Sequence, residues 1–261
     1  MKNNRLETVV QAVVDNVRDA VREHNVTFEE YRAAIGYIMK TVEAKELPLL
    51  IDVFLNATMC EVINQNSASG ASPADMEGPY FVPDVPKVDA IGGQIQVMDS
   101  YEDDEPMEIR GHVLDLDGNP VPDATVFIWS STPDGKYSGI HEGIPAGYYR
   151  CQLQTGDDGR FVVNSTVPVP YTIPDNGPVG GLLVSMGRHT WRPAHVHYKV
   201  CKDGYRELIT QSYFADCPYV NNDCCEGIVP EEFVMPVKIE DGKRIVEITI
   251  KIEPAVAMAA E

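Results

Sequence analysis

The chain of 261 residues is long enough to bury a sizeable core, in one large domain or in two smaller ones. Its 40 acidic residues outnumber its 21 basic residues and give a formal net charge of -19. This balance excludes a nucleic-acid-binding role, which requires clustered lysines and arginines, and it favours a neutral small molecule over a strongly anionic ligand.

The amino-terminal segment has no apolar stretch of the signal-peptide type, and no later segment is expected to span a bilayer. A cytoplasmic protein is therefore expected. None of the six cysteines forms a CxxC pair or a zinc-like spacing. In a reducing compartment they are interpreted as small buried apolar residues.

Residues up to about 66 are predicted to be helical. Apolar residues recur at steps of three and four from Leu6 to Val21. Thr27 and Glu30 form a capping-box pattern that starts a second helix, and a third helix opens near Pro48. These apolar stripes indicate either a helical bundle that covers a sheet or a surface that pairs two chains or contacts lipid. Periodicity alone favours the covering bundle.

The small and polar stretch 66–73 is predicted to be a linker, after which the pattern becomes typical of β-strands. Short β-rich runs cover residues 107–114, 125–131, 159–167, 195–200 and 244–253. In the last run Val246, Ile248 and Ile250 alternate with polar residues, as in a strand with one buried face. The predicted fold is mainly β: an antiparallel β-sandwich core over residues 76–261, preceded by an α-helical region over residues 1–75.

His195 and His197 form a His-x-His pair in one of these runs. Residues two positions apart on a strand point to the same side of a sheet, so both imidazoles can reach one metal ion. Histidine is the commonest metal ligand, but it also occurs as a structural residue in many sheets. The pair alone leaves both interpretations open.

Two histidines leave a metal ion under-coordinated, and three completions are possible. A carboxylate would have to come from a distant strand. Cys201, four residues after His197, has the same strand parity. Tyr137 and Tyr171 lie in loops beside predicted strand ends. A tyrosine, whose pKa is ordinarily about 10, binds as phenolate only to a strongly charged cation such as Fe(III).

At this point the sequence resembles a known family, the intradiol ring-cleavage dioxygenases, which are non-haem Fe(III) enzymes that act on catechols. The resemblance spans most of residues 77–223. It is carried by Asp134-Gly135-Lys136-Tyr137-Ser138, Tyr149-Arg150-Cys151, Pro168-Val169-Pro170-Tyr171-Thr172-Ile173-Pro174, Arg192-Pro193-Ala194-His195-Val196-His197, Leu208-Ile209-Thr210-Gln211 and Glu77-Gly78-Pro79-Tyr80-Phe81. The helical start is similar to that of the catechol and hydroxyquinol 1,2-dioxygenase branch.

The resemblance implies that Fe(III) is held by Tyr137, Tyr171, His195 and His197. It also implies that Tyr171 leaves the metal when substrate binds and acts as a base. Arg192 is expected to stabilise negative charge on the reacting ring carbon, because its guanidinium is planar and permanently charged. Gln211 matches a position beside the ligands.

By the same analogy, the substrate pocket is expected to be lined by Met76, Pro79, Arg192, Cys224 and Cys225. Relatives often place an aromatic residue and a small one where this chain has the two cysteines. The implied function is O2-dependent cleavage of a catechol to a cis,cis-muconate, with hydroxyquinol or chlorocatechol as alternative substrates. The implied assembly is a homodimer through the amino-terminal helices, with lipid as a further candidate partner. From a different class, a non-catalytic metal-binding β-sandwich module remains the alternative.

Overall fold

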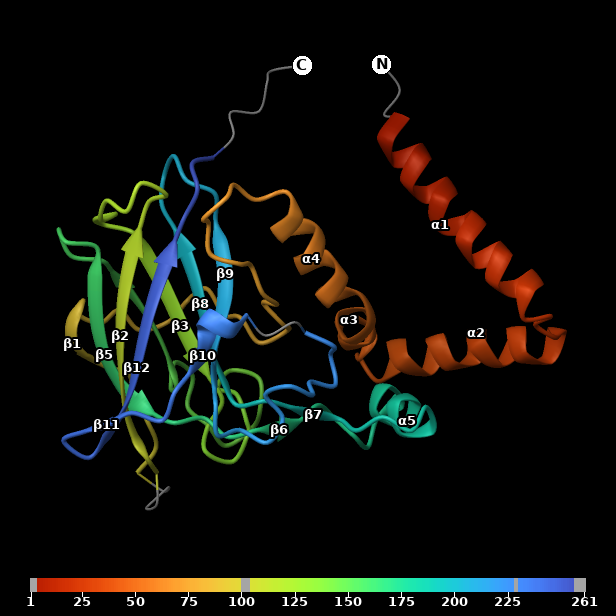
Figure 1. Ribbon diagram of the computed structural model, residues 1–261. Helices are drawn as coiled ribbons and strands as arrows, with labels where there is room; N and C mark the ends of the chain where they lie inside the picture. The colour runs from red at the N-terminus through yellow and green to blue at the C-terminus, as the bar shows by residue number, and fades with distance from the viewer. Residues whose placement is uncertain (1–3, 100–103, 228–229, 256–261) are drawn as a thin grey trace. The chain divides into compact units, whose positions relative to one another are not determined.

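The structure is a computed structural model that describes residues 4–99, 104–227 and 230–255 (Figure 1). It divides into two compact units, Met1–Leu47 and Pro48–Glu261. The first unit contains two helices, α1 (Asn4–Glu23) and α2 (Phe28–Glu43). The predicted capping box starts α2: the Thr27 hydroxyl accepts a hydrogen bond from the Glu30 backbone, and the Glu30 carboxylate accepts one from the Thr27 backbone at 2.7 Å.

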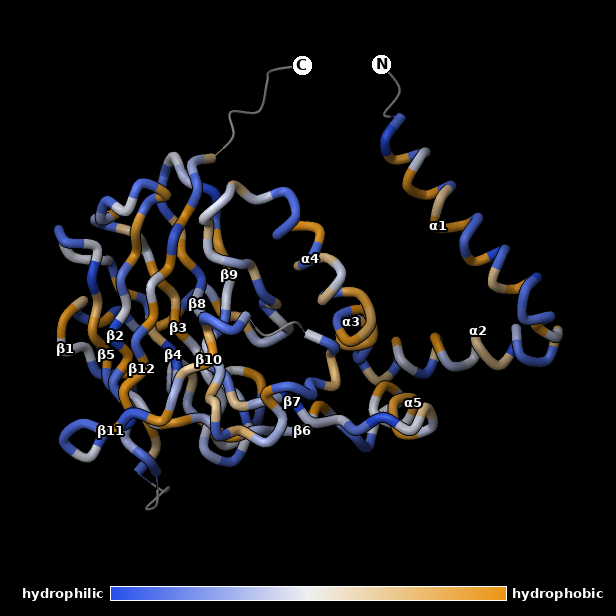
Figure 2. The backbone as a smooth tube through the Cα atoms, viewed as in Figure 1, coloured by the Kyte–Doolittle hydropathy of each residue, from blue (hydrophilic) through white to orange (hydrophobic). Residues whose placement is uncertain are grey.

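The apolar stripes of α1 and α2 are exposed. No described residue of α1 is buried, and Val13 and Phe28 are 58% and 67% exposed. Figure 2 shows apolar and polar residues following one another along both helices. Amphipathic helices ordinarily bury such a stripe, and within the first unit the described residues leave it uncovered.

The second unit begins with a continuous helical segment made of α3 (Leu47–Ile51, whose first residue closes the first unit), the π-helical turn η1 (Asp52–Asn56) and α4 (Ala57–Gln65). Its 19 residues are long and apolar enough to cross a membrane, although no segment of that kind was expected. However, Val53 is 1% exposed and belongs to an apolar cluster that includes Met76 and Ile173 of the same unit. Helices that pack on a protein core pass the same test of length and composition, so the segment gives no clear membrane span.

Two five-stranded sheets follow (Figure 1). The first has the order β1-β5-β2-β12-β11, with β1 Ile91–Gln94, β5 Arg160–Thr166, β2 Pro106–Leu114, β12 Lys243–Lys251 and β11 Ile239–Glu240. The second has the order β10-β9-β8-β3-β4, with β10 Val234–Met235, β9 Leu208–Phe214, β8 His195–Cys201, β3 Thr125–Ser130 and β4 Arg150–Gln154. A 3-10 turn, η2 (Glu231–Phe233), precedes β10.

The sheets pack face to face, which confirms the predicted sandwich and its helical start. Ile109 and Val246 of the first sheet share one buried cluster with Val126, Val196 and Tyr198 of the second. Most neighbouring strands are antiparallel, whereas β12 runs parallel to β2, β1 to β5 and β10 to β9. The alternation predicted for residues 244–253 is observed from Val246 to Ile250, since Glu247 and Thr249 are exposed between the buried Val246, Ile248 and Ile250.

A third element lies outside the sandwich. It is a two-stranded sheet of β6 (Tyr171–Thr172) and β7 (Trp191–Arg192), and the strands are joined through the short helix α5 (Pro178–Ser185). Tyr171 pairs directly with Arg192 across this sheet. The chain then enters β8 at His195. The pairing of β6 with β7 therefore brings Tyr171 close to the start of β8, although the two are more than 20 residues apart in the sequence.

Candidate metal centre and reaction pocket

The side chains of His195 and His197 point away from the core, on the outer face of the second sheet. Strand alternation sends Val196 and Tyr198 into the core between the sheets, and the two histidines to the other side. Both histidines are 1% exposed. The Nδ1 atom of His195 lies 2.7 Å from the Pro193 carbonyl, to which only a protonated nitrogen can donate. This contact leaves the Nε2 lone pair of His195 free to bind a cation.

Two neighbouring strands fix the orientation of His197. Trp129 of β3 pairs with it in register and stacks on its ring, with centroids 4.5 Å apart and planes 3° apart. On the other side Gln211 of β9 pairs with His197. Gln211 is fully buried and donates from Nε2 to the Met76 carbonyl at 2.5 Å, so it is not a surface amide. The strand pairing thus places Gln211 beside the histidines.

Tyr171 reaches the histidines from β6. Its side chain passes close to Gly135, where an added Cβ would lie 2.6 Å from the Tyr171 Cβ. Gly135 also has a φ of +81°, which other residues rarely adopt. The Asp134-Gly135-Lys136-Tyr137 turn therefore requires glycine for two reasons, its conformation and the approach of the second tyrosine.

Tyr137 is held by a buried arginine that the sequence did not single out for a role. Arg150, 2% exposed, donates from Nε to the Ser138 hydroxyl at 2.8 Å and from Nη2 to the Ser138 carbonyl at 2.6 Å. Its Nη1 donates to the Tyr80 carbonyl at 3.0 Å, and the Tyr80 ring stacks on Tyr137 with centroids 4.5 Å apart. The Tyr149-Arg150-Cys151 motif thus clamps the loop that carries Tyr137.

The four side chains predicted to be ligands converge on one point. The hydroxyl oxygens of Tyr137 and Tyr171 are 3.3 Å apart, Tyr137 Oη is 3.4 Å from His195 Nε2, and the Nε2 atoms of His195 and His197 are 3.0 Å apart. Ligand atoms about 2.1 Å from a shared ion, at angles of about 90–109°, lie about 3.0–3.4 Å from one another. The donor set therefore fits a single metal ion.

The electrostatics of these groups suit a trivalent cation. Burial, and then Arg192, lowers the pKa of His195 to about 3, and burial together with His195 holds the pKa of His197 well below its ordinary value. Both imidazoles are thus neutral donors. Burial raises the pKa of Tyr137 to about 12 and raises that of Tyr171 well above its ordinary value. Only a strongly charged ion would convert these phenols to phenolates.

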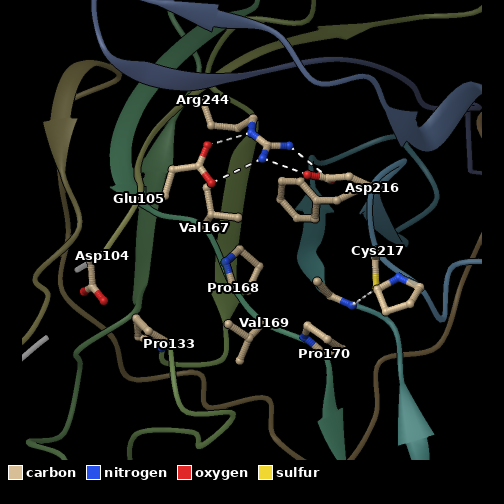
Figure 3. Close-up of a pocket in the computed structure, with 13 residues that line it drawn as sticks. Asp104, Glu105, Pro133, Val167, Pro168, Val169, Pro170, Asp216, Cys217 and Arg244 are labelled. Atoms are coloured by element: carbon tan, nitrogen blue, oxygen red, sulfur yellow. Dashed lines mark hydrogen bonds and ion pairs between the residues drawn. The ribbon is translucent and has the colours of Figure 1, made fainter.

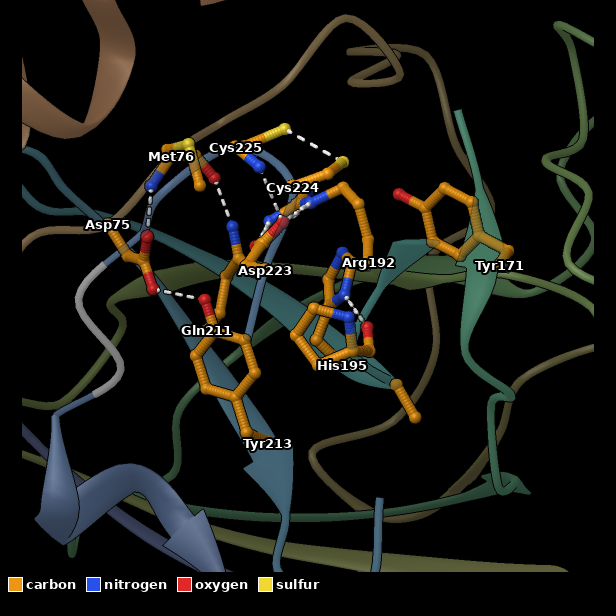
Figure 4. Close-up of polar contacts among 12 residues, drawn as sticks. Asp75, Met76, Tyr171, Arg192, His195, Gln211, Tyr213, Asp223, Cys224 and Cys225 are labelled. Carbon is orange, nitrogen blue, oxygen red and sulfur yellow. Dashed lines mark hydrogen bonds and ion pairs between the residues drawn. The ribbon is translucent and has the colours of Figure 1, made fainter. Parts of the chain in front are cut away.

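Arg192 is 5% exposed and forms a buried ion pair with Asp223 (Figure 4). Its Nη2 lies 2.9 Å, and its Nε 3.2 Å, from the same carboxylate oxygen. Burial lowers the pKa of Arg192, but the attraction of Asp223 together with that of Tyr171, Cys225 and Tyr213 outweighs it, and the net pKa is raised. Arg192 is therefore a fixed cation beside the expected ligands, and it is held by Asp223, a residue that no sequence pattern marked for this role.

The expected substrate wall is only partly assembled. Met76, Cys224 and Cys225 lie together in one buried apolar cluster, with the two thiol sulfurs 3.9 Å apart. Val53 from the helical segment joins this cluster, although sequence patterns had assigned its helix only a covering role. Pro79 differs from expectation, because it is exposed and belongs to none of the buried clusters. The adjacent Tyr80 points inward in its place.

The other two completions of the metal site are not assembled. The Cys201 thiol is partly exposed and contacts Glu207 at 3.3 Å. Among the residues that the structure describes, three or more His, Cys, Asp and Glu side chains come close enough to share a metal only at Asp223, Cys224 and Cys225, and this group contains neither histidine.

A cavity of about 600 Å³ lies elsewhere, against the loop that precedes Tyr171 (Figure 3). Its one arginine, Arg244, donates at 2.9 Å to both Glu105 and Asp216, so its charge is already satisfied. The cavity is lined by Ala194 and Pro170 but by none of the four expected ligands. It is a different site from the one at which the ligands converge.

Two family models match nearly the whole chain. A model described as dioxygenase matches residues 76–253, and a model described as catechol dioxygenase N terminus matches residues 3–72. The first covers the segments that carry the expected ligands, and the second covers the amino-terminal helices.

Curated relatives match over most of their length. A chlorocatechol 1,2-dioxygenase from a Pseudomonas species is 46% identical, with 97% of this chain and 98% of that protein aligned. A hydroxyquinol 1,2-dioxygenase from a Rhizobium species is 33% identical over 94% of this chain and 83% of that protein. The crystal structure of a chlorocatechol 1,2-dioxygenase from Pseudomonas putida superimposes with a TM-score of 0.88 at 42% identity, and covers 96% of this chain and 99% of that one.

Proposed function

Since the chain belongs to the intradiol ring-cleaving dioxygenase family and is a catechol-type 1,2-dioxygenase, we propose that it acts on a chlorinated catechol with Fe(III) held by Tyr137, Tyr171, His195 and His197. It is an enzyme and not the non-catalytic module kept as an alternative above. The observation that carries the iron proposal is the series of contacts of 3.0–3.4 Å that links the two phenol oxygens and the two imidazole nitrogens, from Tyr171 through Tyr137 and His195 to His197. The family uses non-haem iron, and this donor set supplies the two anionic ligands that a ferric ion prefers.

The proposed ligands also provide the acid–base chemistry of substrate binding. A catechol must lose two protons to bind through both oxygens. The phenolate oxygen of Tyr171 would accept one of them and a solvent-derived hydroxide the other, and this neutralisation would let Tyr171 turn away from its neighbours. Tyr171 is the better candidate because it lies on a two-residue strand, whereas Tyr137 is anchored through Ser138 and Arg150. Held by these four residues, Fe(III) would withdraw electron density from the deprotonated ring, which would make a ring carbon reactive toward O2.

Arg192 stabilises the negative charge that develops at that ring carbon. The guanidinium is buried, permanently ionised and held by Asp223, so no reorganisation is needed when negative charge appears. Gln211 is a positioning residue: its amide holds the Met76 carbonyl, while its strand pairs with that of His197.

The composition of the pocket wall is evidence for a chlorinated substrate. Met76, Cys224 and Cys225 form an apolar and polarisable surface together with Val53 and Ile173. Such a surface accommodates a chlorine atom without leaving a polar group unpaired. The 46% identity to a chlorocatechol 1,2-dioxygenase, against 33% to a hydroxyquinol 1,2-dioxygenase, supports the same choice. Chlorocatechol therefore replaces unsubstituted catechol as the preferred candidate, and catechol and hydroxyquinol become the comparison substrates.

We further propose a homodimer through the helical region 1–75, with the catalytic domain in residues 76–261. The exposed apolar stripes of α1 and α2 support a partner surface, which a second copy or bound lipid would cover. Light scattering at micromolar concentration is expected to give twice the chain mass of 28.9 kDa. A monomer under these conditions would contradict the dimer. A cytoplasmic location is also proposed, because all six cysteines are unpaired thiols.

Steady-state rates with a panel of substrates test the proposed preference. The iron-loaded protein is expected to give its highest kcat/KM with a chlorocatechol and lower values with catechol and hydroxyquinol. Equal or higher kcat/KM for hydroxyquinol would reject the preference. Iron analysis of the same preparation is expected to give one iron per chain.

A further inference from the structure

A second set of potential metal ligands, none of which is among the four proposed for Fe(III), lies at the cysteine wall of the pocket. Cys224 Sγ lies 3.9 Å from Cys225 Sγ, and these atoms and a carboxylate oxygen of Asp223 all lie within 4.8 Å of one another. Cys224 and Cys225 are 3% and 5% exposed. Figure 4 shows the two sulfurs side by side next to Asp223 and Arg192. Thiolate sulfur is a soft donor, unlike the phenol and imidazole atoms of the first site.

The spacing of the sulfurs suits one ion. With metal–sulfur bonds of about 2.3 Å, a separation of 3.9 Å corresponds to a sulfur–metal–sulfur angle of about 115°. That angle lies between tetrahedral and trigonal geometry, which the filled-shell cations Zn²⁺ and Cd²⁺ adopt. The Asp223 oxygen is close enough to become a third ligand after a small movement.

The backbone of this turn is already fixed. The Cys225 backbone N–H donates to the Asp223 carboxylate at 2.9 Å, and the Cys224 N–H donates to the Trp191 carbonyl at 3.0 Å. Arg188 donates to the Cys224 carbonyl at 2.7 Å. Little conformational entropy therefore remains to be lost when an ion binds.

We infer that Asp223, Cys224 and Cys225 form a second metal site, selective for a thiophilic divalent cation, whose occupation inhibits the enzyme. Two thiols bind one cation and release two protons, and no atom changes its oxidation state. The carboxylate that joins the cation is the one that holds Arg192 at 2.9 Å, so the cation competes with Arg192 for Asp223. It also places charge in the apolar wall. The inhibition, though not the binding, rests on the proposed function.

The hydrogen bond with Cys225, followed by burial, raises the pKa of Cys224, so this thiol carries its proton at neutral pH before a cation binds. Cation binding must displace that proton, and the apparent affinity is expected to rise with pH.

Cadmium titration of the iron-loaded enzyme tests the inference. One equivalent of Cd²⁺ per chain is expected to produce an ultraviolet thiolate-to-cadmium absorption band and to lower turnover roughly tenfold, equivalent to the loss of one charge-assisted contact. The visible iron band and the iron content are expected to stay unchanged. Loss of iron in step with inhibition would overturn the proposal, because the cation would then act at the first site.

Variants locate the bound cation. Cys224→Ser and Cys225→Ser are each expected to weaken cadmium binding by at least about tenfold, because one thiolate ligand is lost. The control is Cys201→Ser, which removes a partly exposed thiol at the end of β8 and is expected to keep both the band and the basal activity. An unchanged band in the Cys224→Ser/Cys225→Ser double variant would refute the site.

One further measurement does not depend on how the variants fold. A small dithiol is expected to restore the activity of the cadmium-inhibited unmodified enzyme at concentrations where a monothiol does not; equal recovery with both would argue against a two-thiolate site. If the enzyme cleaves no catechol at all, the proposed function fails, whereas the ultraviolet band and its stoichiometry still decide whether the second site exists.

Discussion

Tyr171 and Arg192 face each other as a cross-strand pair in the two-stranded sheet of β6 and β7. The pairing places the tyrosine expected to leave the metal directly beside the cation expected to stabilise charge on the ring. Asp223 anchors Arg192 from the opposite side, with a distance of 2.9 Å between Nη2 and the carboxylate. The positions of base and cation are therefore set by one small piece of backbone.

Replacing Tyr171 tests its roles as ligand and base. In Tyr171→Phe the visible phenolate-to-iron band is expected to weaken, and kcat to fall on the order of 10²-fold, because a ligand and a proton acceptor are lost together. The control is Tyr198→Phe, which removes a buried hydroxyl bonded to Ser212 at 3.0 Å. That variant is expected to lose about 1 kcal/mol of stability and to keep the band. An unchanged band and rate in Tyr171→Phe would remove the residue from the site.

Breaking the buried ion pair is expected to destabilise the fold. Asp223→Asn leaves Arg192 buried without a counter-ion and should lower the free energy of unfolding by about 3–5 kcal/mol in denaturant titrations. The control Asp158→Asn removes a carboxylate that is 65% exposed and should change stability by less than about 0.5 kcal/mol. Equal effects of the two changes would contradict the assigned role of the pair.

The same pair predicts a dependence of stability on pH. Burial raises the pKa of Asp223, but Arg192 and the hydrogen bonds to the carboxylate outweigh it, so the net pKa is lowered. An acid with a lowered folded-state pKa contributes stability above its unfolded pKa of about 3.9, and this contribution is lost as the pH falls through the folded value. Asp223→Asn should therefore flatten the acid limb of the stability curve below about pH 4. If the variant loses stability below pH 4 in the same way as the unmodified chain, the ionisation of Asp223 does not contribute to this pH dependence.

Arg150 is predicted to set the position of Tyr137. Arg150→Met removes three hydrogen bonds to Ser138 and Tyr80, and should broaden the visible band and speed the loss of iron to a chelator. The loss of stability is expected to be at least about 1.5–3 kcal/mol, since bonds to a charged donor are lost. Arg160→Met, at a position 61% exposed, is the matched control. Iron retention equal to that of the control would show that the clamp is not needed.

The cysteine wall predicts substrate preference. Cys224→Phe fills part of the apolar cluster, so kcat/KM for a chlorocatechol should fall relative to that for catechol by at least about tenfold, the discrimination that one extra group in an apolar pocket gives. Competition between the two substrates in one reaction measures this ratio directly. Val184→Phe, at a position 63% exposed, is the control and should leave the ratio unchanged. If Cys224→Phe leaves this ratio unchanged, the substrate ring does not bind against Cys224.

Periodic patterns predicted much of the fold. The alternation around Val246 and Ile250 identified β12, because one face of that strand is buried and the other exposed. By contrast, β4 and β9 are buried on both faces over most of their length, so they carry no alternation from which their bounds could be predicted. The parallel pairing of β12 with β2 depends on contacts between segments more than 100 residues apart, which periodicity does not encode.

The site was predictable to a smaller extent. Strand geometry alone placed His195 and His197 on one face, but Tyr137 and Tyr171 came from the family resemblance. Their convergence depends on the passage of one tyrosine past Gly135. Asp223 and Arg150 were not predicted as functional residues, since their partners are 31 and 12 residues away and no local pattern marks them. Buried ion pairs of this kind become visible only when the chain is folded.

Product analysis with labelled oxygen tests the central claim most directly. The iron-loaded protein is incubated with a chlorocatechol under oxygen-18 gas, and the product is identified by mass spectrometry. The account predicts a chlorinated cis,cis-muconate in which both atoms of one O2 molecule are found in the two new carboxyl groups. A ring-opened semialdehyde, or a protein that binds iron and substrate without consuming O2, would contradict it.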